Sequence, residues 1–293
     1  MGLGEFFALA SAFVWALAVV LFRRTNNVLP AFETNLYKIF LGFVLLWPTV
    51  LLVEGFTLPE FTLLEFCTVV LSGYLGIAVA DTWYLRALHL VGAARTGIIS
   101  SLLSPYVILL SVLFLSESLG PLQIGGFALV MAGLLLVSWQ ANREQVDAKD
   151  LRKGMLYGVT AVFLMAVGVV MVKGIRETRS FMWTVQLRMA GGFLGMLLYM
   201  GIRGRFRQAL AHYRRPLPWG LITAASFLGS YVSMIMWLYS YKLIPASVSS
   251  VLNQSANAWM VLLAWLVLNE YIGARKVYGL VLTTAGVLLM LLA

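Results

Sequence analysis

Long apolar stretches alternate with short polar breaks along the whole chain. Each stretch holds about 20 residues, and a helix of that length crosses the roughly 30 Å hydrocarbon core of a bilayer. We therefore expect an all-α integral membrane protein with ten transmembrane helices. The predicted spans cover residues 4–22, 31–53, 62–86, 96–115, 121–139, 154–172, 181–201, 217–241, 246–268 and 273–292.

The two halves of the sequence match one another at offsets of 150 and then 153 residues. Since each half holds five spans, an odd number, the second half must enter the membrane from the opposite side. We predict two inverted five-helix repeats, 1–139 and 154–293, joined by a linker at 140–153, with a substrate site near the bilayer midplane. Matching positions include Gly4 with Gly154, Lys38 with Arg188, Leu90 with Leu243, Glu117 with Glu270, and Gly133 with Gly286.

Composition supports the membrane assignment. Apolar residues make up 61% of the chain and charged residues 11%, against roughly 45–50% and 25% in soluble domains. The net charge is +9, but the basic residues cluster in the breaks, where they suit lipid headgroups better than nucleic acid. Fifteen lie in odd-numbered connections and four in even-numbered ones, which predicts cytoplasmic odd connections and both termini outside.

Three charged residues lie at least five positions from either end of a predicted span, and a charge costs about 2.5–3.5 kcal/mol at the helix centre. Lys38 and Asp81 lie at similar depth in the second and third spans and can form an ion pair. The pair is either a static lock between two helices or a coupling site at which a protonatable Asp81 links proton movement to transport. A third alternative is that both side chains snorkel to the membrane surface.

Arg188 occupies the position in the second repeat that Lys38 occupies in the first, but the residue equivalent to Asp81 is the apolar Met234 or Ile235. A guanidinium that has no carboxylate partner can bind a substrate carboxylate through two parallel hydrogen bonds. The alternative is that Arg188 snorkels to the nearby connection.

Small polar residues follow one face of the fourth span, at Ser100 and Ser104, and of the ninth span, at Asn253 and Asn257. We expect the two polar stripes to face one another near the midplane and to line a substrate cavity. The alternative is ordinary hydrogen bonding between packed helices, worth about 0.6 kcal/mol per contact. The aromatic residues expected to form cavity walls are Trp15, Tyr74, Tyr231 and Trp237.

Other residues predict structure rather than chemistry. Glu117 and Glu270 directly precede the fifth and tenth spans, where a carboxylate stabilises the unpaired amides of a helix N-terminus. Pro105 frees a backbone carbonyl in the fourth span and predicts a kink there. The glycines near 125–133 and 191–195 predict close helix packing. The sequence contains no Walker motif or other catalytic signature, and one cysteine and two histidines favour neither a disulfide nor a metal site.

Several short motifs stand out along the chain, and some of them occur at matching places in both halves. They are Trp15-Ala16, the run Ala87–Arg95, Leu115-Ser116-Glu117, Leu268-Asn269-Glu270, and the glycines Gly126, Gly133, Gly279 and Gly286. With the ten spans they resemble EamA-type members of the drug/metabolite transporter superfamily over the whole chain. The resemblance implies an exporter of amino acids or other metabolites that works by alternating access. It also implies cytoplasmic termini, opposite to the orientation that the basic residues predict.

We therefore expect a multi-pass transporter of the cytoplasmic (inner) cell membrane, not an enzyme, that exports a small amphipathic metabolite such as an amino acid or a related carboxylate. The expected partners are that substrate, membrane lipids and protons as a candidate coupling ion, with no cofactor, and the protein is expected to be a monomer or homodimer. The alternatives are a multidrug or nucleoside-type exporter, an intramembrane enzyme, and an inert scaffold.

Overall fold

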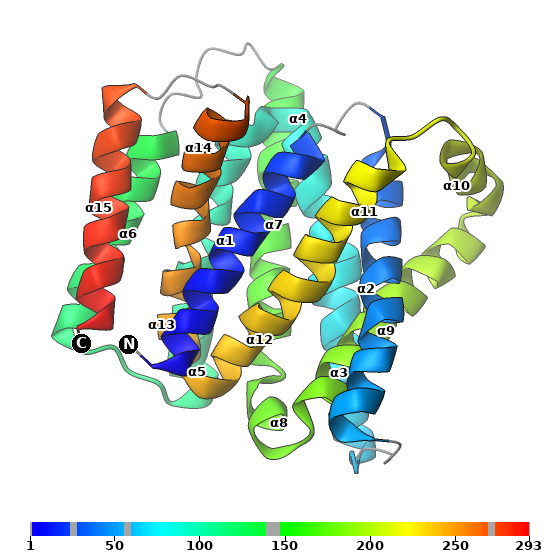
Figure 1. The fold of residues 1–293 in the computed structure, drawn as a ribbon, viewed down its shortest axis with the longest axis horizontal. Helices are drawn as coiled ribbons and strands as arrows, with labels where there is room; N and C mark the ends of the chain where they lie inside the picture. Colours follow the sequence, from blue (N-terminus) through cyan, green and yellow to red (C-terminus); the bar gives the residue numbers. More distant parts are fainter. Residues whose placement is uncertain (1, 24–27, 56–59, 139–146, 269–272, 293) are drawn as a thin grey trace.

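A computed structural model of the chain describes residues 2–23, 28–55, 60–138, 147–268 and 273–292. All regular secondary structure within these ranges is helical (Figure 1). The first half contains α1 (Leu3–Arg23), α2 (Ala31–Glu54), α3 (Leu63–Gly73), η1 (Tyr74–Val79), α4 (Ala80–Ser100), α5 (Leu103–Leu115) and α6 (Pro121–Ser138). The second half contains α7 (Ala148–Val170), α8 (Lys173–Thr178), α9 (Phe181–Ile202), α10 (Phe206–Tyr213), α11 (Trp219–Phe227), η3 (Leu228–Val232), α12 (Ser233–Leu243), α13 (Ala246–Asn253), α14 (Ser255–Leu268) and α15 (Ala274–Leu291).

The helices are long and apolar enough for a multi-pass membrane protein. Six segments in the described ranges meet the length and hydropathy needed to cross a bilayer, and further apolar helices are shorter. The six segments are Leu3–Phe22, Ala31–Glu54, Leu63–Ala87, Ala148–Thr178, Phe181–Ile202 and Trp219–Leu243. The shorter ones are Leu103–Leu115, Pro121–Leu136 and Val277–Leu291.

Each half contains a π-helical segment at the same place. The last five residues of η1, 75–79, correspond to the whole of η3, 228–232, at the offset of 153 residues. Both segments connect without interruption to α-helices on either side, so α3–η1–α4 and α11–η3–α12 are equivalent rods. π-Segments often occur at functional sites, and here Asp81 lies directly after η1.

The prediction of a connection at residues 87–95 is wrong, because helix α4 continues through these residues to Ser100. The equivalent stretch of the second half does turn, between α12 and α13. Pro245 stands there, at the position of Gly92 in the first half, and proline cannot continue a helix from the preceding turn. The run Ala87–Arg95 holds good helix formers and no proline, which allows the helix to continue.

The halves pack against each other in a reciprocal way. Helix α1 packs on α12, α13 and α14, and its counterpart α7 packs on α4 and α5. Helices α6 and α15, the last of each half, form a pair at one side of the molecule (Figure 1). Both termini lie at the same end as α8. Of the positions named above, Asn269, Glu270, the end positions 1 and 293, position 139 of the fifth span and positions 140–146 of the predicted linker lie outside the described residues.

The glycines of the α6–α15 pair allow their backbones to touch. A Cβ on Gly133 would lie 2.6 Å from the carbonyl oxygen of Gly279, and one on Gly286 would lie 2.6 Å from that of Gly126. Real Cβ atoms do not approach a carbonyl so closely, and small residues at such positions are typical of helix pairs in membranes. The predicted close packing is therefore confirmed for these glycines.

Candidate functional site

Two helices are interrupted at equivalent positions. The turn at Ser101–Leu102 separates α4 from α5, and Gln254, the equivalent of Ser101, separates α13 from α14. In the first half the helix is broken by Pro105, which has no N–H to donate to the carbonyl of Ser101 four residues earlier. The predicted kink is confirmed. Broken helices at membrane depth expose backbone groups that can bind polar ligands.

The polar residues of the two breaks contact one another. The Nε2 of Gln254 donates to the carbonyl oxygen of Ser100 at 3.2 Å, and Ser104 Oγ donates to the carbonyl oxygen of Ser250 at 2.9 Å. Asn257 Nδ2 donates to Gln254 Oε1 at 3.0 Å. The two broken helices therefore contact one another, but the hydrogen bonds between them are made at Gln254 and Ser250 and not by the predicted pair Asn253 and Asn257. Gln254, the residue at the centre of these contacts, was not singled out as a site residue from the sequence.

Asn253 points toward α1 instead. Its Nδ2 donates to Ser11 Oγ at 2.8 Å and to the carbonyl oxygen of Ala8 at 3.3 Å. Ser233 Oγ of α12 donates to the carbonyl oxygen of Ser11 at 3.2 Å. The polar contacts around the break of α13 therefore extend from one repeat to the first helix of the other.

The predicted ion pair between α2 and α4 is present. Lys38 Nζ lies 2.6 Å from Asp81 Oδ2, and the two side chains are 10% and 18% exposed. The same ammonium lies 5.7 Å from the ring centroid of Trp15 on α1, within the range of a cation–π interaction. Three helices of the first repeat therefore meet at this charge.

Arg188 is buried, with 1% of its surface exposed. Its Nη1 donates to Ser72 Oγ at 3.0 Å and to the carbonyl oxygen of Gly168. Arg176 of α8 is fully buried, and its Nη2 donates to the next carbonyl, that of Val169, at 3.3 Å. The two guanidinium groups therefore occupy the C-terminal end of α7, where free carbonyls and the helix dipole favour positive charge.

Neither arginine has a carboxylate partner in the described part of the chain. The Nε atoms of Arg176 and Arg188, and Nη1 of Arg176, have no hydrogen-bond acceptor there. The ring of Tyr241 lies 5.7 Å from the guanidinium carbon of Arg176. Arg176 lies between the predicted spans 154–172 and 181–201, and nothing in its local sequence indicates that it is buried.

The remaining aromatic candidates occupy different places. Tyr74 is 40% exposed, and its ring fills the space where Gly195 of α9 lacks a side chain. The hydroxyl of Tyr231 forms a hydrogen bond with Thr49 Oγ1 of α2. Trp237 is partly buried, with its ring centroid 5.5 Å from that of Tyr241.

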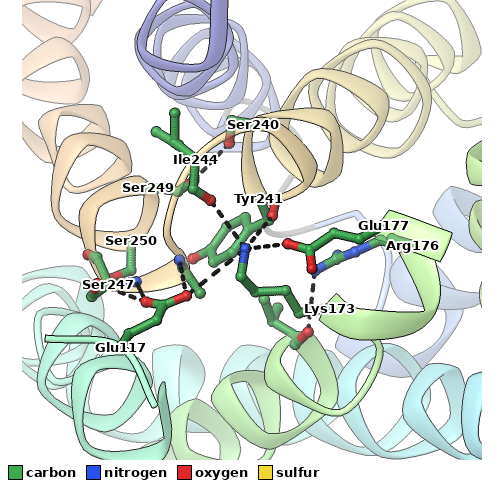
Figure 2. A network of polar contacts seen from close by, with 12 residues as sticks. Glu117, Lys173, Arg176, Glu177, Ser240, Tyr241, Ile244, Ser247, Ser249 and Ser250 are labelled. Atoms are coloured by element: carbon green, nitrogen blue, oxygen red, sulfur yellow. Dashed lines mark hydrogen bonds and ion pairs between the residues drawn. The ribbon is translucent and has the colours of Figure 1, made fainter. Parts of the chain in front are cut away.

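A network of polar contacts joins both halves at the end of the molecule that holds the termini (Figure 2). Glu117, predicted to cap the helix after it, instead accepts hydrogen bonds from the backbone amides of Ala246 and Ser247 at 2.8 and 3.0 Å. Lys173 Nζ lies 2.7 Å from Glu177 Oε1 and 3.8 Å from Glu117 Oε1. A cavity of about 380 Å³ adjoins these residues.

The comparisons with known proteins agree with this architecture. A model of the EamA-like transporter family matches twice, over residues 2–139 and 152–292. Protein LicB of Haemophilus influenzae is 25% identical over 98% of this chain and 97% of its own length. The UDP-N-acetylglucosamine transporter of Rattus norvegicus is 31% identical over 104 residues, 32% of each chain.

A solved crystal structure shares the fold. It covers 99% of this chain and 96% of its own, with a TM-score of 0.76 and 17% sequence identity. The repeated family match, together with the equivalent broken helices, confirms the resemblance inferred from the sequence motifs. The chain belongs to the EamA-like transporter family, and it is a multi-pass membrane protein of a family that transports small molecules.

Proposed function

We propose that this protein is a secondary transporter that moves a small anionic metabolite by alternating access. In this proposal ten spans form two inverted repeats, 1–139 and 154–293, and the two repeats rock against one another around a central site. The observation that carries the proposal is the pair of helix breaks at Ser101 and Gln254, which are equivalent in sequence and are joined by the hydrogen bond from Gln254 to the carbonyl of Ser100. Transporters with inverted repeats bind substrate at such discontinuous helices.

The substrate site in this proposal lies at the breaks. Ser100, Ser104, Asn253 and Asn257 offer neutral donors and acceptors there, and Gln254 joins the two broken helices. Aromatic walls would come from Trp15, Tyr231 and Trp237. Tyr74 is the weakest member of the set, because its ring packs on the outer side of α9 at Gly195 and is 40% exposed.

An anionic substrate is favoured by two buried guanidinium groups that form no ion pair with a carboxylate of the described residues. Arg176 and Arg188 are both buried and retain N–H groups that have no acceptor among the described residues. A buried charge without a counter-ion is costly. A substrate carboxylate or phosphate that approaches when the repeats move would supply the missing acceptors.

Two anionic substrate classes follow from different observations. Amino acids and related carboxylates fit a single guanidinium such as Arg188 and the small polar residues. A nucleotide sugar is favoured by the similarity to the UDP-N-acetylglucosamine transporter, and its diphosphate would suit two arginines. In this proposal the protein transports either substrate across the cytoplasmic cell membrane. The direction of transport depends on the orientation of the chain in that membrane.

Counterflow in proteoliposomes tests the proposal. Vesicles are loaded with one unlabelled compound from a panel of amino acids, their amides and UDP-sugars, and the uptake of the same labelled compound is measured. Gln254→Leu should lower uptake about tenfold, because it removes the hydrogen bonds of Gln254 with the carbonyl of Ser100 and with the amide of Asn257, each worth about 0.5–1.5 kcal/mol. Gln208→Leu, at an exposed position of α10, is the matched control. Uptake that is absent for every compound, or unchanged in Gln254→Leu, contradicts the proposal.

A further inference from the structure

The turn between α12 and α13 is held by opposite charges at its two ends. Helix α13 begins at Ala246, and Pro245 before it supplies no side-chain cap. Glu117, from the connection after α5, accepts hydrogen bonds from the amides of Ala246 and Ser247 and from Ser247 Oγ at 2.8, 3.0 and 2.7 Å. A carboxylate 129 positions earlier in the chain therefore caps this helix.

Lys173 binds the other side of the same turn. Its Nζ donates to the carbonyl oxygens of Tyr241 and Ile244, at the C-terminal end of α12, at 3.1 and 3.2 Å. It also donates to Glu177 at 2.7 Å and lies 3.8 Å from Glu117. A cation at a helix C-terminus and an anion at a helix N-terminus are both favoured by the helix dipoles. We call Glu117 and Lys173 the turn clamp (Figure 2).

The turn clamp separates two environments. On one side is the cavity of about 380 Å³, lined by Glu117, Lys173, Glu177 and residues 242–245. On the other side Ser240 and Ser249 are fully buried and share a hydrogen bond of 2.6 Å between their hydroxyls. These serines do not line the cavity. The side chains of the turn clamp are 11% and 8% exposed, so they form the inner wall of the cavity.

The turn clamp also joins the two repeats. Glu117 belongs to the first half, whereas Lys173 and the α12–α13 turn belong to the second. Where repeats rock against each other, some contacts between them at one end of the molecule form when that end closes and break when it opens. A permanent cap can come from a residue within the same helix, as Glu65 caps the start of α3. A cap that comes from the opposite repeat, as Glu117 does here, can be broken when the repeats move apart.

We propose that Glu117 and Lys173 form the gate that closes the transport pathway at the end of the molecule where the termini lie. The gate opens when the carboxylate leaves the N-terminus of α13, and substrate then passes between the 380 Å³ cavity and the polar interior. This inference rests on the proposed alternating-access function. Both residues act by positioning the repeats, and neither needs to bind the substrate.

Spin-label distance measurements on the purified, membrane-reconstituted full chain test the gate. Labels are placed at Ser118→Cys and Thr178→Cys, two exposed positions in the connections that carry the turn clamp, with Cys67→Ser as background. With the clamp intact we expect one main distance. Glu117→Gln keeps the size of the side chain but removes its charge. Since a charge-assisted hydrogen bond contributes about 1.5–3 kcal/mol, the ratio of open to closed molecules should rise about ten- to a hundredfold and a longer distance should appear.

The controls separate a gate from a merely structural cap. Glu5→Gln makes the same chemical change near the start of α1, where Glu5 accepts a hydrogen bond from the amide of Gly2 and has no other partner among the described residues, so the distances should stay unchanged. Lys173→Gln should open the gate like Glu117→Gln, and it replaces that variant if Glu117→Gln does not fold. A lower melting temperature with unchanged distances in both variants overturns the gate. Absent counterflow would contradict the transport function alone, because the distances are measured without substrate.

Discussion

The Lys38–Asp81 pair offers a quantitative test, because a static lock and a proton-coupling site predict different transport by the variant in which both charges are removed. At 2.6 Å and an effective dielectric constant of about 20, the attraction is about 6 kcal/mol. Removing two charges from water costs a comparable amount, so replacing the whole pair by apolar residues is close to neutral. Removing only one partner leaves the other charge without a counter-ion, and that charge is mostly buried because the side chains of Lys38 and Asp81 are only 10% and 18% exposed.

We therefore expect Lys38→Met to lower the free energy of unfolding by about 3 kcal/mol, the lower end of the range for broken buried pairs, because Asp81 keeps some contact with solvent. The double variant Lys38→Met/Asp81→Leu should lie within about 1 kcal/mol of the original chain. Unfolding in mixed micelles, followed through the fluorescence of the nine tryptophans, measures both. Equal losses in the single and double variants would refute the coupling between the two charges.

Transport by the double variant then separates the two roles. If the pair is a static lock, the double variant transports substrate under a pH gradient as the original chain does. If Asp81 carries the coupling proton, counterflow survives in the double variant but a pH gradient no longer drives accumulation. Asp81→Asn provides the control that removes the titrating group at nearly constant volume.

Three further outcomes are expected. Arg188→Lys should weaken uptake of a carboxylate substrate by about tenfold, because an ammonium cannot reproduce the planar fork, and equal effects on its amide would mean that Arg188 only braces α7. Gly133→Ala should lower the unfolding free energy by about 1–3 kcal/mol through overpacking against α15, whereas Gly174→Ala, with open space around it, should not. A topology reporter fused after Ala293 should lie outside the cytoplasm if the distribution of basic residues governs insertion, and a cytoplasmic signal would contradict this.

The site was only partly predictable from the sequence. The stripes Ser100–Ser104 and Asn253–Asn257 were visible because a helix places residues four apart on one face. The two helices do contact one another, but through Gln254 and Ser250, whereas Asn253 donates to α1, and this choice of partners depends on how the repeats pack. Arg176 was missed because its sequence position, just after an apolar span, is typical of a connection at the membrane surface, while the structure buries it completely.

The sequence by itself determined the membrane class, the two repeats and the Lys38–Asp81 pair, because these depend on local hydropathy, on periodicity and on depth along single helices. Only the tertiary structure decided which helix Glu117 caps and where Arg188 donates its hydrogen bonds. Both contacts join residues that are far apart in the chain and belong to different elements, and local sequence carries no information about which helix end lies opposite a given charge. A buried charge binds whichever free amide or carbonyl the packing of the repeats brings near it.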